Sequence, residues 1–215
     1  MSNISILGAG FIGQMHALAI HSASVSRHNL SKTPKLLDLF EISENKNLAE
    51  EVASRYGFQN IVLQDPKSAL TKSDLDIFWN AGPNKAHTEA TTIAAQAGAH
   101  VFCEKPLAPT SDEALDLLIN IQKTDVKHMC AFIHRFIPSL QLAHKMIKSG
   151  EIGEVQHFRS QFLLDMREAD GSLTWRFIKA LAGGGASGDL GSHHIDVARF
   201  LVGEIEEVCA TTRTW

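Results

Sequence analysis

Six short apolar or β-branched runs alternate with longer helical stretches in the first part of this chain. The runs are Ile4–Leu7, Lys35–Phe40, Ile61–Leu63, Leu75–Trp79, His100–Cys103 and His128–Ile133. Parallel strands need a long crossover between them, and the crossover is usually a helix. The alternation therefore predicts an α/β fold with a doubly wound parallel sheet.

A start signal marks one of the intervening helices. Glu113 follows Thr110 by three residues, so each side chain can accept a hydrogen bond from the free backbone amide of the other. Apolar residues then follow at Leu115, Leu118 and Ile119. The pattern predicts a helix that begins at this point of the chain.

The pattern changes after Ile133, and we expect a domain boundary near Arg135. The later part is predicted to be a partial α+β domain with an open sheet at residues 136–215, after a first domain at residues 1–135. Its segments are a helix over Pro138–Ser149 that ends at Gly150, a strand over Val155–Leu164, a glycine-rich stretch Gly183–Gly188, a helix over Leu190–Val202 and a strand over Glu207–Arg213.

Two strands make a sheet that is marginally stable by itself, and its open edges invite further pairing. We therefore expect residues 136–215 to form part of a larger sheet. Either further strands follow in a longer chain, or a partner supplies them.

Composition excludes several classes of protein. The chain has 20 Lys plus Arg and 24 Asp plus Glu, a formal charge of -4, so it lacks a net positive field for nucleic acid or an anionic membrane surface. Its 44% hydrophobic and 20% charged residues are typical of a globular protein rather than a disordered one. Polar residues interrupt the apolar stretch Ile4–Ile20 and no Lys or Arg precedes it, so neither a signal peptide nor a membrane span is expected.

The cysteines indicate the compartment. Cys103, Cys130 and Cys209 are odd in number and widely spaced, which fits neither a disulfide framework nor a metal knuckle. We expect reduced thiols, a cytoplasmic location and no metal site.

A glycine motif directly follows the first predicted strand. Residues Gly8-Ala9-Gly10-Phe11-Ile12-Gly13 form a GxGxxG sequence that opens a helix. The first glycine permits a tight turn, the second lets a pyrophosphate approach the backbone, and the third allows close helix packing. The free amides of the helix N-terminus suit the pyrophosphate. The motif predicts a dinucleotide-binding Rossmann fold, with a plain glycine-rich turn as the alternative.

Rossmann sites usually carry an acidic residue at the end of the second strand, where it holds the adenosine ribose hydroxyls. Glu41 directly follows the run Lys35–Phe40 and favours NAD over NADP as the cofactor. The distance from Gly13 exceeds the usual spacing of about 20 residues, so we expect an extended first helix or loop. Ser43 or Glu44 could occupy the position instead, and an ordinary exposed Glu is a further alternative.

Three further clusters complete a pattern with the N-terminal glycines. They are Pro83-Asn84 with His87 after the fourth predicted strand, Glu104-Lys105-Pro106 after the fifth, and Gly188-Asp189-Leu190-Gly191-Ser192-His193-His194-Ile195-Asp196 late in the chain. Together these residues resemble the Gfo/Idh/MocA oxidoreductases, a family named for glucose-fructose oxidoreductase and inositol dehydrogenase. The family couples a Rossmann domain to an α/β domain with a large open sheet. Its members are substantially longer, so this chain resembles a C-terminally truncated member.

The resemblance implies that Lys105 lies beside the nicotinamide and the substrate hydroxyl. An ammonium group at the carboxyl end of a strand agrees with where open α/β sheets bind ligands. The alternative is a solvated pair, Glu104 and Lys105, before a turn. The residues expected to bind the cofactor are Gly8, Gly10, Phe11, Ile12, Gly13, Glu41, Pro83, Asn84, His87, Glu104 and Lys105.

Asp189 and His193 are four residues apart, which is one helical turn, so the carboxylate can orient the imidazole and fix its tautomer. The other ring nitrogen would then accept a substrate proton. His194 lies five residues from Asp189 and off that helix face, so spacing and the family motif both select His193. The alternatives are a capping Asp, a core histidine or, less favoured, a metal site.

Arg135, Trp175 and Arg176 are weaker candidates for the substrate pocket, because an Arg can hold a hydroxyl or carboxylate and an aromatic face suits a sugar ring. Ordinary packing and surface charge are the alternatives. Relatives often carry Asn-Arg where this chain has His134-Arg135, so a contact there is expected to differ. No role is assigned to the remaining histidines, which include His16, His21 and His144.

The expected function is an NAD-dependent oxidoreductase, with NADP as the other possible cofactor, acting on a sugar, cyclitol or related polyol. The substrate class is implied by the resemblance alone. A homo-oligomer is compatible with the open sheet. The alternative from another class is a non-catalytic dinucleotide-binding protein, or an inactive fragment of such an enzyme.

Overall fold

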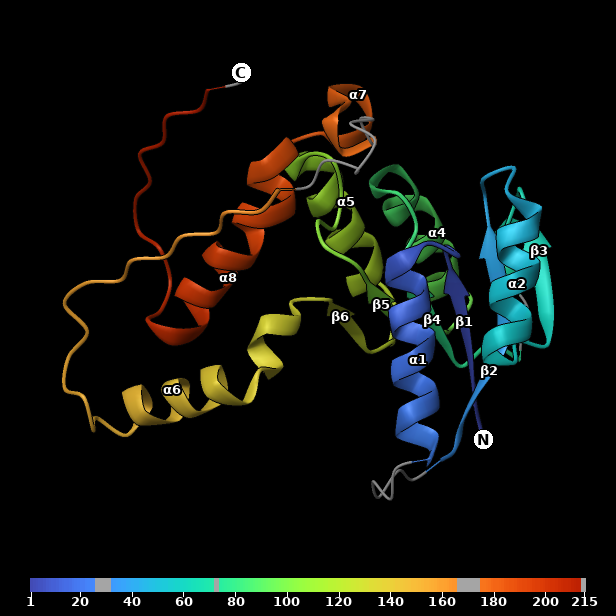
Figure 1. The fold of residues 1–215 in the computed structure, drawn as a ribbon, viewed down its shortest axis with the longest axis horizontal. Helices are drawn as coiled ribbons and strands as arrows, with labels where there is room; N and C mark the ends of the chain where they lie inside the picture. Colours follow the sequence, from blue (N-terminus) through green and yellow to red (C-terminus); the bar gives the residue numbers. More distant parts are fainter. Residues whose placement is uncertain (26–31, 72–73, 166–174, 214–215) are drawn as a thin grey trace. The chain divides into compact units, whose positions relative to one another are not determined.

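The computed structural model describes residues 1–25, 32–71, 74–165 and 175–213, without the side chains of Trp175, Ala180 and Leu181. The chain divides into two compact units (Figure 1). Unit 1 comprises Met1–Ala131 and Leu173–Gly185, and unit 2 comprises Phe132–Ser172 and Ala186–Trp215.

Unit 1 is built on a parallel sheet of six strands in the order β3-β2-β1-β4-β5-β6. The strands are β1 (Ser2–Leu7), β2 (Pro34–Glu41), β3 (Asn60–Leu63), β4 (Ile77–Asn80), β5 (His100–Cys103) and β6 (His128–Cys130). This order is that of the doubly wound Rossmann fold. All six predicted strands and their parallel arrangement are confirmed, although the last is shorter than expected because the chain turns into a 3-10 helix after Ala131.

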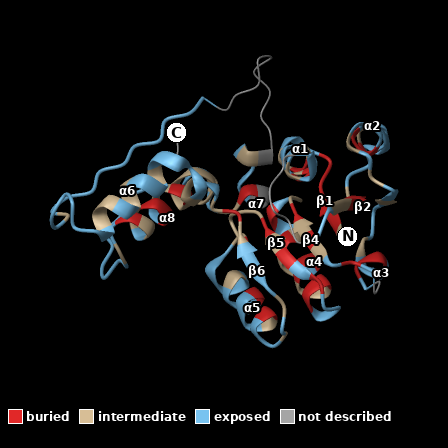
Figure 2. Cartoon of the chain, turned by 90° about the horizontal axis from the view of Figure 1, so that it is seen from below, coloured by how far each residue is buried: buried red, intermediate tan, exposed pale blue. Residues whose placement is uncertain are grey.

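Helices cover both faces of the sheet. Side chains of α1 (Phe11–Val25) and α2 (Lys46–Tyr56) pack on one face, and those of α3 (Lys67–Leu70), α4 (Asn84–Gln96) and α5 (Ser111–Gln122) pack on the other. Figure 2 shows the buried residues concentrated on the strands and on the helix sides that meet them. The alternation of β1 explains this division, because Ile4 and Ile6 belong to the cluster under α1 whereas Leu7 belongs to the one under α4.

The sheet order reverses between β1 and β4, which are hydrogen-bonded neighbours although they are distant in sequence. Crossovers from β1 lead to one side of this point and crossovers from β4 lead to the other. Open α/β sheets bind ligands outside the carboxyl ends of the strands at such a point. The loops that follow β1, β4 and β5 therefore carry the candidate site of unit 1.

The capping box predicted for α5 is present. Thr110 Oγ1 accepts the Glu113 backbone N–H at 3.3 Å, and Glu113 Oε2 accepts the Thr110 backbone N–H at 3.2 Å. The buried residues of this helix are Leu117 and Ile121. The apolar residues singled out from the sequence are exposed instead: Leu115, Leu118 and Ile119.

The described part of unit 2 is helical where it has regular structure. Its elements are η1 (Ile133–Phe136), α6 (Pro138–Lys148), the π-helical turn η3 (Ser187–Gly191) and α8 (Ser192–Leu201). Two short elements of the later sequence, η2 (Trp175–Phe177) and α7 (Lys179–Ala182), fall in unit 1. The predicted helices over Pro138–Ser149 and Leu190–Val202 are thus confirmed, the second with a π-helical start.

The strands predicted over Val155–Leu164 and Glu207–Arg213 are wrong for this chain. Both segments are described, and both are irregular. A strand exists through hydrogen bonds to a neighbouring strand, and neither segment forms such a ladder with any described residue. The open sheet expected in the second domain is therefore not formed within the described part of unit 2.

Two findings concern the chain as a whole. Among the described residues, no helix is both long enough and apolar enough to cross a membrane. No disulfide joins any of the described cysteines Cys103, Cys130 and Cys209, of which Cys103 is buried and Cys209 is exposed. Burial raises the pKa of the Cys103 thiol well above its ordinary value, so this thiol is protonated and unreactive near neutral pH.

Candidate active site

The glycine loop has the backbone geometry that the motif predicts. Gly8 has φ +104°, and a Cβ there would lie 2.6 Å from the carbonyl oxygen of Ala81. A Cβ on Gly13 would lie 1.8 Å from the Gly8 carbonyl oxygen. Only glycine satisfies both contacts, so the first glycine makes the turn and the third lets α1 approach the loop.

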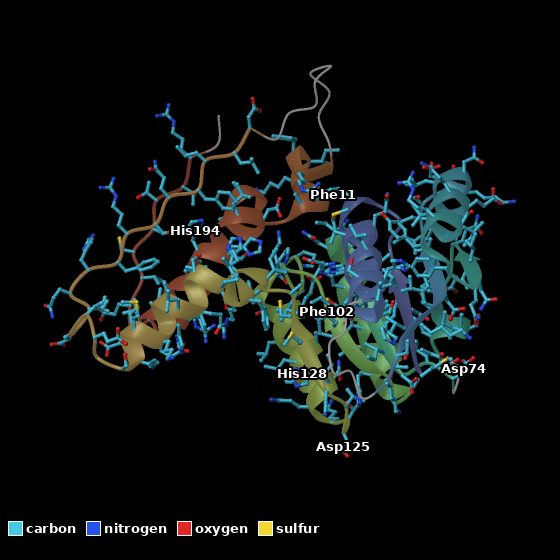
Figure 3. All side chains as sticks on the ribbon, turned by 60° about the horizontal axis from the view of Figure 1, so that its bottom comes forward. Phe11, Asp74, Phe102, Asp125, His128 and His194 are labelled. Atoms are coloured by element: carbon cyan, nitrogen blue, oxygen red, sulfur yellow. The ribbon has the colours of Figure 1, made fainter. Side chains whose placement is uncertain are left out.

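The second glycine differs because it faces open space. A Cβ on Gly10 would meet nothing within 4 Å, and Gly10 itself is exposed. The first helical hydrogen bond of α1 runs from Gln14 N–H to the Gly10 carbonyl at 3.0 Å, so the amides of the first turn precede it and have no helical partner. Phe11, labelled in Figure 3, begins the helix with its side chain 72% exposed. This open helix N-terminus, which has no acidic residue in its first turn, fits a pyrophosphate.

Glu41 lies at the end of β2, beside the glycine loop, as predicted. Its Oε2 accepts the Ala9 backbone N–H at 2.8 Å, and its Oε1 accepts the Ser43 backbone N–H at 2.8 Å. The carboxylate is buried, whereas Ser43 and Glu44 are exposed. Each oxygen retains a lone pair for a ribose hydroxyl. Between Gly13 and Glu41, α1 ends at Val25 and β2 begins at Pro34, and residues 26–31 lie outside the described residues.

The loop after β4 is held from within unit 1. Pro83 is the N-cap of α4, and Asn84 and His87 in its first turns are buried. His87 Nε2 lies 3.0 Å from the Gly82 carbonyl oxygen, and His87 Nδ1 lies 2.7 Å from the Pro106 carbonyl oxygen. Burial lowers the pKa of His87, although the two carbonyls oppose this shift. The imidazole therefore links this loop to the one that carries Lys105.

Glu104, Lys105 and Pro106 follow β5 at the same edge of the sheet. The Glu104 backbone N–H donates to the Asn80 carbonyl at the end of β4, at 2.9 Å. The Lys105 backbone N–H donates to Glu104 Oε2 at 3.1 Å, and all three residues are half-buried. Lys105 thus lies at the carboxyl edge of the sheet, in the loop next to the one after β4, which is the position that its predicted role requires.

His193 belongs to unit 2, where it is buried in the first turn of α8. Asp189 lies in the π-helical turn that precedes α8. The π-helical turn ends at Gly191, so Asp189 lies in a wider turn than His193 and His194, which belong to α8. The rotation of a regular α-helix therefore does not apply between them, and spacing alone does not distinguish His193 from His194. Burial distinguishes the two instead, because His194 is half-buried and contacts Phe162 at 5.1 Å between ring centroids.

The imidazole of His193 is packed between two rings from the start of unit 2. His134 stacks on it at 4.4 Å with an interplanar angle of 28°, and Phe132 meets it edge-on at 6.2 Å. In the same unit Arg135 forms two hydrogen bonds to Asp196 of α8, at 2.8 and 2.6 Å. The segment from Phe132 to Arg135 thus fixes the face of α8 that carries His193.

These contacts bear on the predicted substrate residues. Arg135 pairs bidentately with the buried carboxylate of Asp196, which gives it a structural role within unit 2. Trp175 and Arg176 form η2 in unit 1, where the following α7 meets α4 through the Asn84 side-chain amide and the Ala182 carbonyl at 3.5 Å. Arg176 is half-buried, and the side chain of Trp175 lies outside the described residues.

Sequence reasoning missed three residues of this region. His16 of α1 pairs with Glu104, His134 stacks on His193, and Asp196 binds Arg135. His16 and Glu104 are 88 positions apart, so no local pattern reveals their contact. His134 stands where relatives often carry Asn, and Asp196 is the last residue of the late motif, so neither position carries a local signal for its contact.

Comparison with known proteins places this geometry in a family. A model described as an oxidoreductase family with an NAD-binding Rossmann fold, GFO/IDH/MocA, matches residues 2–132. A second model, the GFO/IDH/MocA C-terminal domain, matches residues 140–215. The first match alone spans more than half of the 215 residues, so the chain belongs to the Gfo/Idh/MocA family. The Rossmann fold of unit 1 is thus of the NAD-binding kind.

Individual relatives include sugar and cyclitol dehydrogenases. Levoglucosan dehydrogenase from Pseudarthrobacter phenanthrenivorans is 38% identical over 214 residues, which are 99% of this chain and 54% of that protein. Inositol 2-dehydrogenase from Rhizobium meliloti is 30% identical over 200 residues, 93% of this chain and 54% of that protein. The structure of levoglucosan dehydrogenase in complex with NADH and levoglucosan matches with a TM-score of 0.88 at 38% identity, covering 94% of this chain and 54% of that one. The chain therefore spans about half the length of these relatives.

Proposed function

We propose that this chain binds NAD and takes part in the NAD-dependent oxidation of a secondary alcohol of a sugar, cyclitol or related polyol. The observation that carries the proposal is the glycine loop, in which Gly8 and Gly13 are fixed by close backbone contacts while Gly10 opens to solvent. The named dehydrogenases among the relatives support the substrate class. Residues 1–135 form the cofactor domain in this account, and residues 136–215 form part of the substrate domain.

The loop residues Gly8–Gly13 would hold the pyrophosphate through the first-turn amides of α1, and Glu41 would hold the adenosine ribose. A carboxylate at that position disfavours a 2′-phosphate by charge repulsion, so NAD is preferred and NADP is the second candidate. When bound, the nicotinamide supplies the hydride acceptor. Pro83, Asn84 and Glu104 line the loops at the same edge of the sheet, and His87 acts there from a buried position.

His193 would take the hydroxyl proton of the substrate as the carbon–hydrogen bond breaks, with Asp189 orienting the imidazole. Lys105 would hydrogen-bond the same oxygen and stabilise the negative charge that develops on it, an effect worth about 3 kcal/mol of barrier. Alcohol oxidation releases one proton and one hydride, so the base and the hydride acceptor together balance the reaction. Arg135, Trp175 and Arg176 are proposed near the substrate, with Arg135 acting mainly through Asp196.

We also propose a location, an oligomeric state and a kind of partner for the protein. We propose a cytoplasmic location, which agrees with the lack of a disulfide among the three described cysteines. A homo-oligomer is proposed because the irregular segments of unit 2 expose large apolar side chains such as Leu163 and Val208. The partner of the site is a small molecule, in keeping with the named substrates of the relatives.

Absorbance at 340 nm tests the proposal. The purified chain is incubated with NAD and a panel of anhydrosugars, inositols and aldoses, and Lys105→Met and His193→Asn serve as matched variants. We expect reduction of NAD with at least one polyol and a loss of about 100-fold in turnover in both variants, with NADH affinity changed by less than about threefold. Tight NADH binding without turnover on any polyol would instead support the non-catalytic alternative.

A further inference from the structure

Two histidines from different helices hold the segment that carries Lys105. On one side, His16 Nε2 of α1 lies 2.9 Å from Glu104 Oε1. On the other side, His87 Nδ1 of α4 lies 2.7 Å from the Pro106 carbonyl oxygen. Lys105 lies between these two anchored residues.

The ring of His16 is fixed by its surroundings. It packs against Trp79 of β4 at 5.0 Å and against Phe102 of β5 at 5.5 Å, measured between ring centroids. Trp79 and Phe102 also contact each other at 4.8 Å, and Figure 3 labels Phe102 on its strand. His16 and Glu104 are each only 13% exposed. The imidazole is therefore held in one orientation by Trp79 and Phe102.

The direction of the hydrogen bond follows from chemistry. An ionised carboxylate only accepts hydrogen bonds. In its contact with such a carboxylate, the Nε2–H group of His16 is therefore the donor and Glu104 Oε1 is the acceptor. The second oxygen of Glu104 accepts the backbone N–H of Lys105 at 3.1 Å. A continuous chain of contacts thus leads from α1 through Glu104 to the backbone of Lys105.

This series of contacts joins two parts of the proposed cofactor site. His16 lies one turn after Gly13 on α1, whose N-terminus presents the amides for the pyrophosphate. The segment Glu104–Pro106 lies at the end of β5 and is also bound to β4 through Asn80. A movement of Lys105 relative to the glycine loop would therefore break the His16–Glu104 contact.

We propose that His16 is a positioning residue for Lys105, acting through Glu104, while His87 fixes the far side of the same segment through Pro106. The inference rests on the proposed role of Lys105 in the reaction. His16 itself is assigned no contact with substrate or reacting atoms. His87 is 1% exposed, so its variants would also report on folding, and His16 is the better residue to test.

Hydrogen exchange provides a test that does not need activity. The full chain is compared with His16→Leu, which removes the donor, with His16→Gln, which keeps an N–H near Nε2, and with His21→Leu, a control at an exposed position of α1. For the peptide spanning Phe102–Ala108 we expect exchange about tenfold faster in His16→Leu and near the original rate in the other two. Exchange of β1 and α2 peptides should remain unchanged, which separates local release from global unfolding. An unchanged Phe102–Ala108 peptide in His16→Leu would overturn the proposal.

Steady-state kinetics add a second readout. We expect kcat to fall about tenfold in His16→Leu and to be largely restored in His16→Gln, while the Kd for NADH changes by less than about threefold. A loss of NADH affinity with unchanged kcat would show that His16 serves the glycine loop, and it would overturn the proposal. If the original chain shows no turnover, the proposed function fails, and the exchange experiment still decides whether His16 holds the Lys105 segment.

Discussion

At the scale of single residues, the three glycines of the loop have separate tasks. The sequence predicted those tasks from the GxGxxG spacing together with its place between a strand and a helix. The close contacts of Gly8 and Gly13 and the open surroundings of Gly10 agree with them. The position of Glu41 was likewise predicted, because the end of the second strand can be recognised from the apolar run that precedes it. His16 could not be predicted, because its role depends on a partner 88 positions away.

Substitution of the glycines separates folding from binding. Gly13→Ala places a Cβ 1.8 Å from the Gly8 carbonyl, so the backbone must move and the free energy of unfolding should fall by about 3 kcal/mol. Gly10→Ala meets no protein atom within 4 Å and should change stability by less than about 1 kcal/mol. Its methyl group occupies the approach of the pyrophosphate, so NADH affinity should fall at least about tenfold. Urea unfolding and fluorescence titration of both variants measure these effects, and equal stability loss in the two would contradict the assignment.

His87 gives a pH dependence of stability. Burial lowers its pKa below the ordinary value of 6.5, so the unfolded chain takes up the proton more readily than the folded one. The contribution of neutral His87 to the free energy of unfolding is complete above pH 6.5, and it is lost as the pH falls through the folded-state pKa. Urea unfolding at pH 7.5 and pH 5.5 should show a smaller acid-induced loss in His87→Asn than in the original chain. The same loss in both proteins would show that His87 does not contribute in this way.

At the scale of elements, prediction succeeded where the signal is local and failed where it depends on a neighbour. The strands of unit 1 and the capping box of α5 follow from apolar runs and from one pair of polar residues. Which face of α5 is buried depends on the elements packed against it: Leu117 and Ile121 are buried, whereas the apolar residues Leu115, Leu118 and Ile119 are exposed. The segments Val155–Leu164 and Glu207–Arg213 have strand-like sequences, but they find no strand to pair with among the described residues.

The two partners of the ion pair that joins η1 to α8 should differ in how much stability is lost when each is replaced. The side chain of Asp196 is 4% exposed, whereas that of Arg135 is 38% exposed. Arg135→Met leaves a buried carboxylate without its cation and should destabilise unit 2 by about 3 kcal/mol. Asp196→Asn leaves an Arg that water can still reach, so the cost should be nearer to about 1 kcal/mol. Thermal unfolding of the two variants measures the difference, and the reverse order would contradict a structural role for Arg135.

At the scale of the whole molecule, the chain combines a six-stranded sheet with a helical unit in which two irregular segments belong to no sheet among the described residues. Family membership extends over both units, because one family model matches residues 2–132 and another matches residues 140–215. The chain spans about half the length of its relatives. The sequence could predict the doubly wound sheet because all six strands find their hydrogen-bonding partners within unit 1. The two segments predicted as strands in unit 2 find no such partner among the described residues.

Hydrogen exchange of the full chain tests this contrast. Amides of β1, β4 and β5 are paired on both sides within the sheet and should exchange slowly. Amides of residues 155–165 and 205–213 lie outside helices and strands and should exchange within seconds. Mass spectrometry of peptides from both regions gives the comparison. Strong protection of the two later segments would indicate that they are paired, either with each other or with a second copy of the chain.

A parallel titration of the chain with NADH and NADPH, followed by nicotinamide fluorescence, shows whether the glycine loop binds NAD, with Gly10→Ala as the control. We expect saturable binding of NADH, at least about tenfold weaker binding of NADPH because of Glu41, and at least about a tenfold loss of NADH affinity, or about 1.4 kcal/mol, in the variant. Saturation would also raise the unfolding temperature, since a ligand that binds only the folded state stabilises it. Absence of saturable binding of either dinucleotide, or equal NADH affinity in Gly10→Ala, would contradict the account.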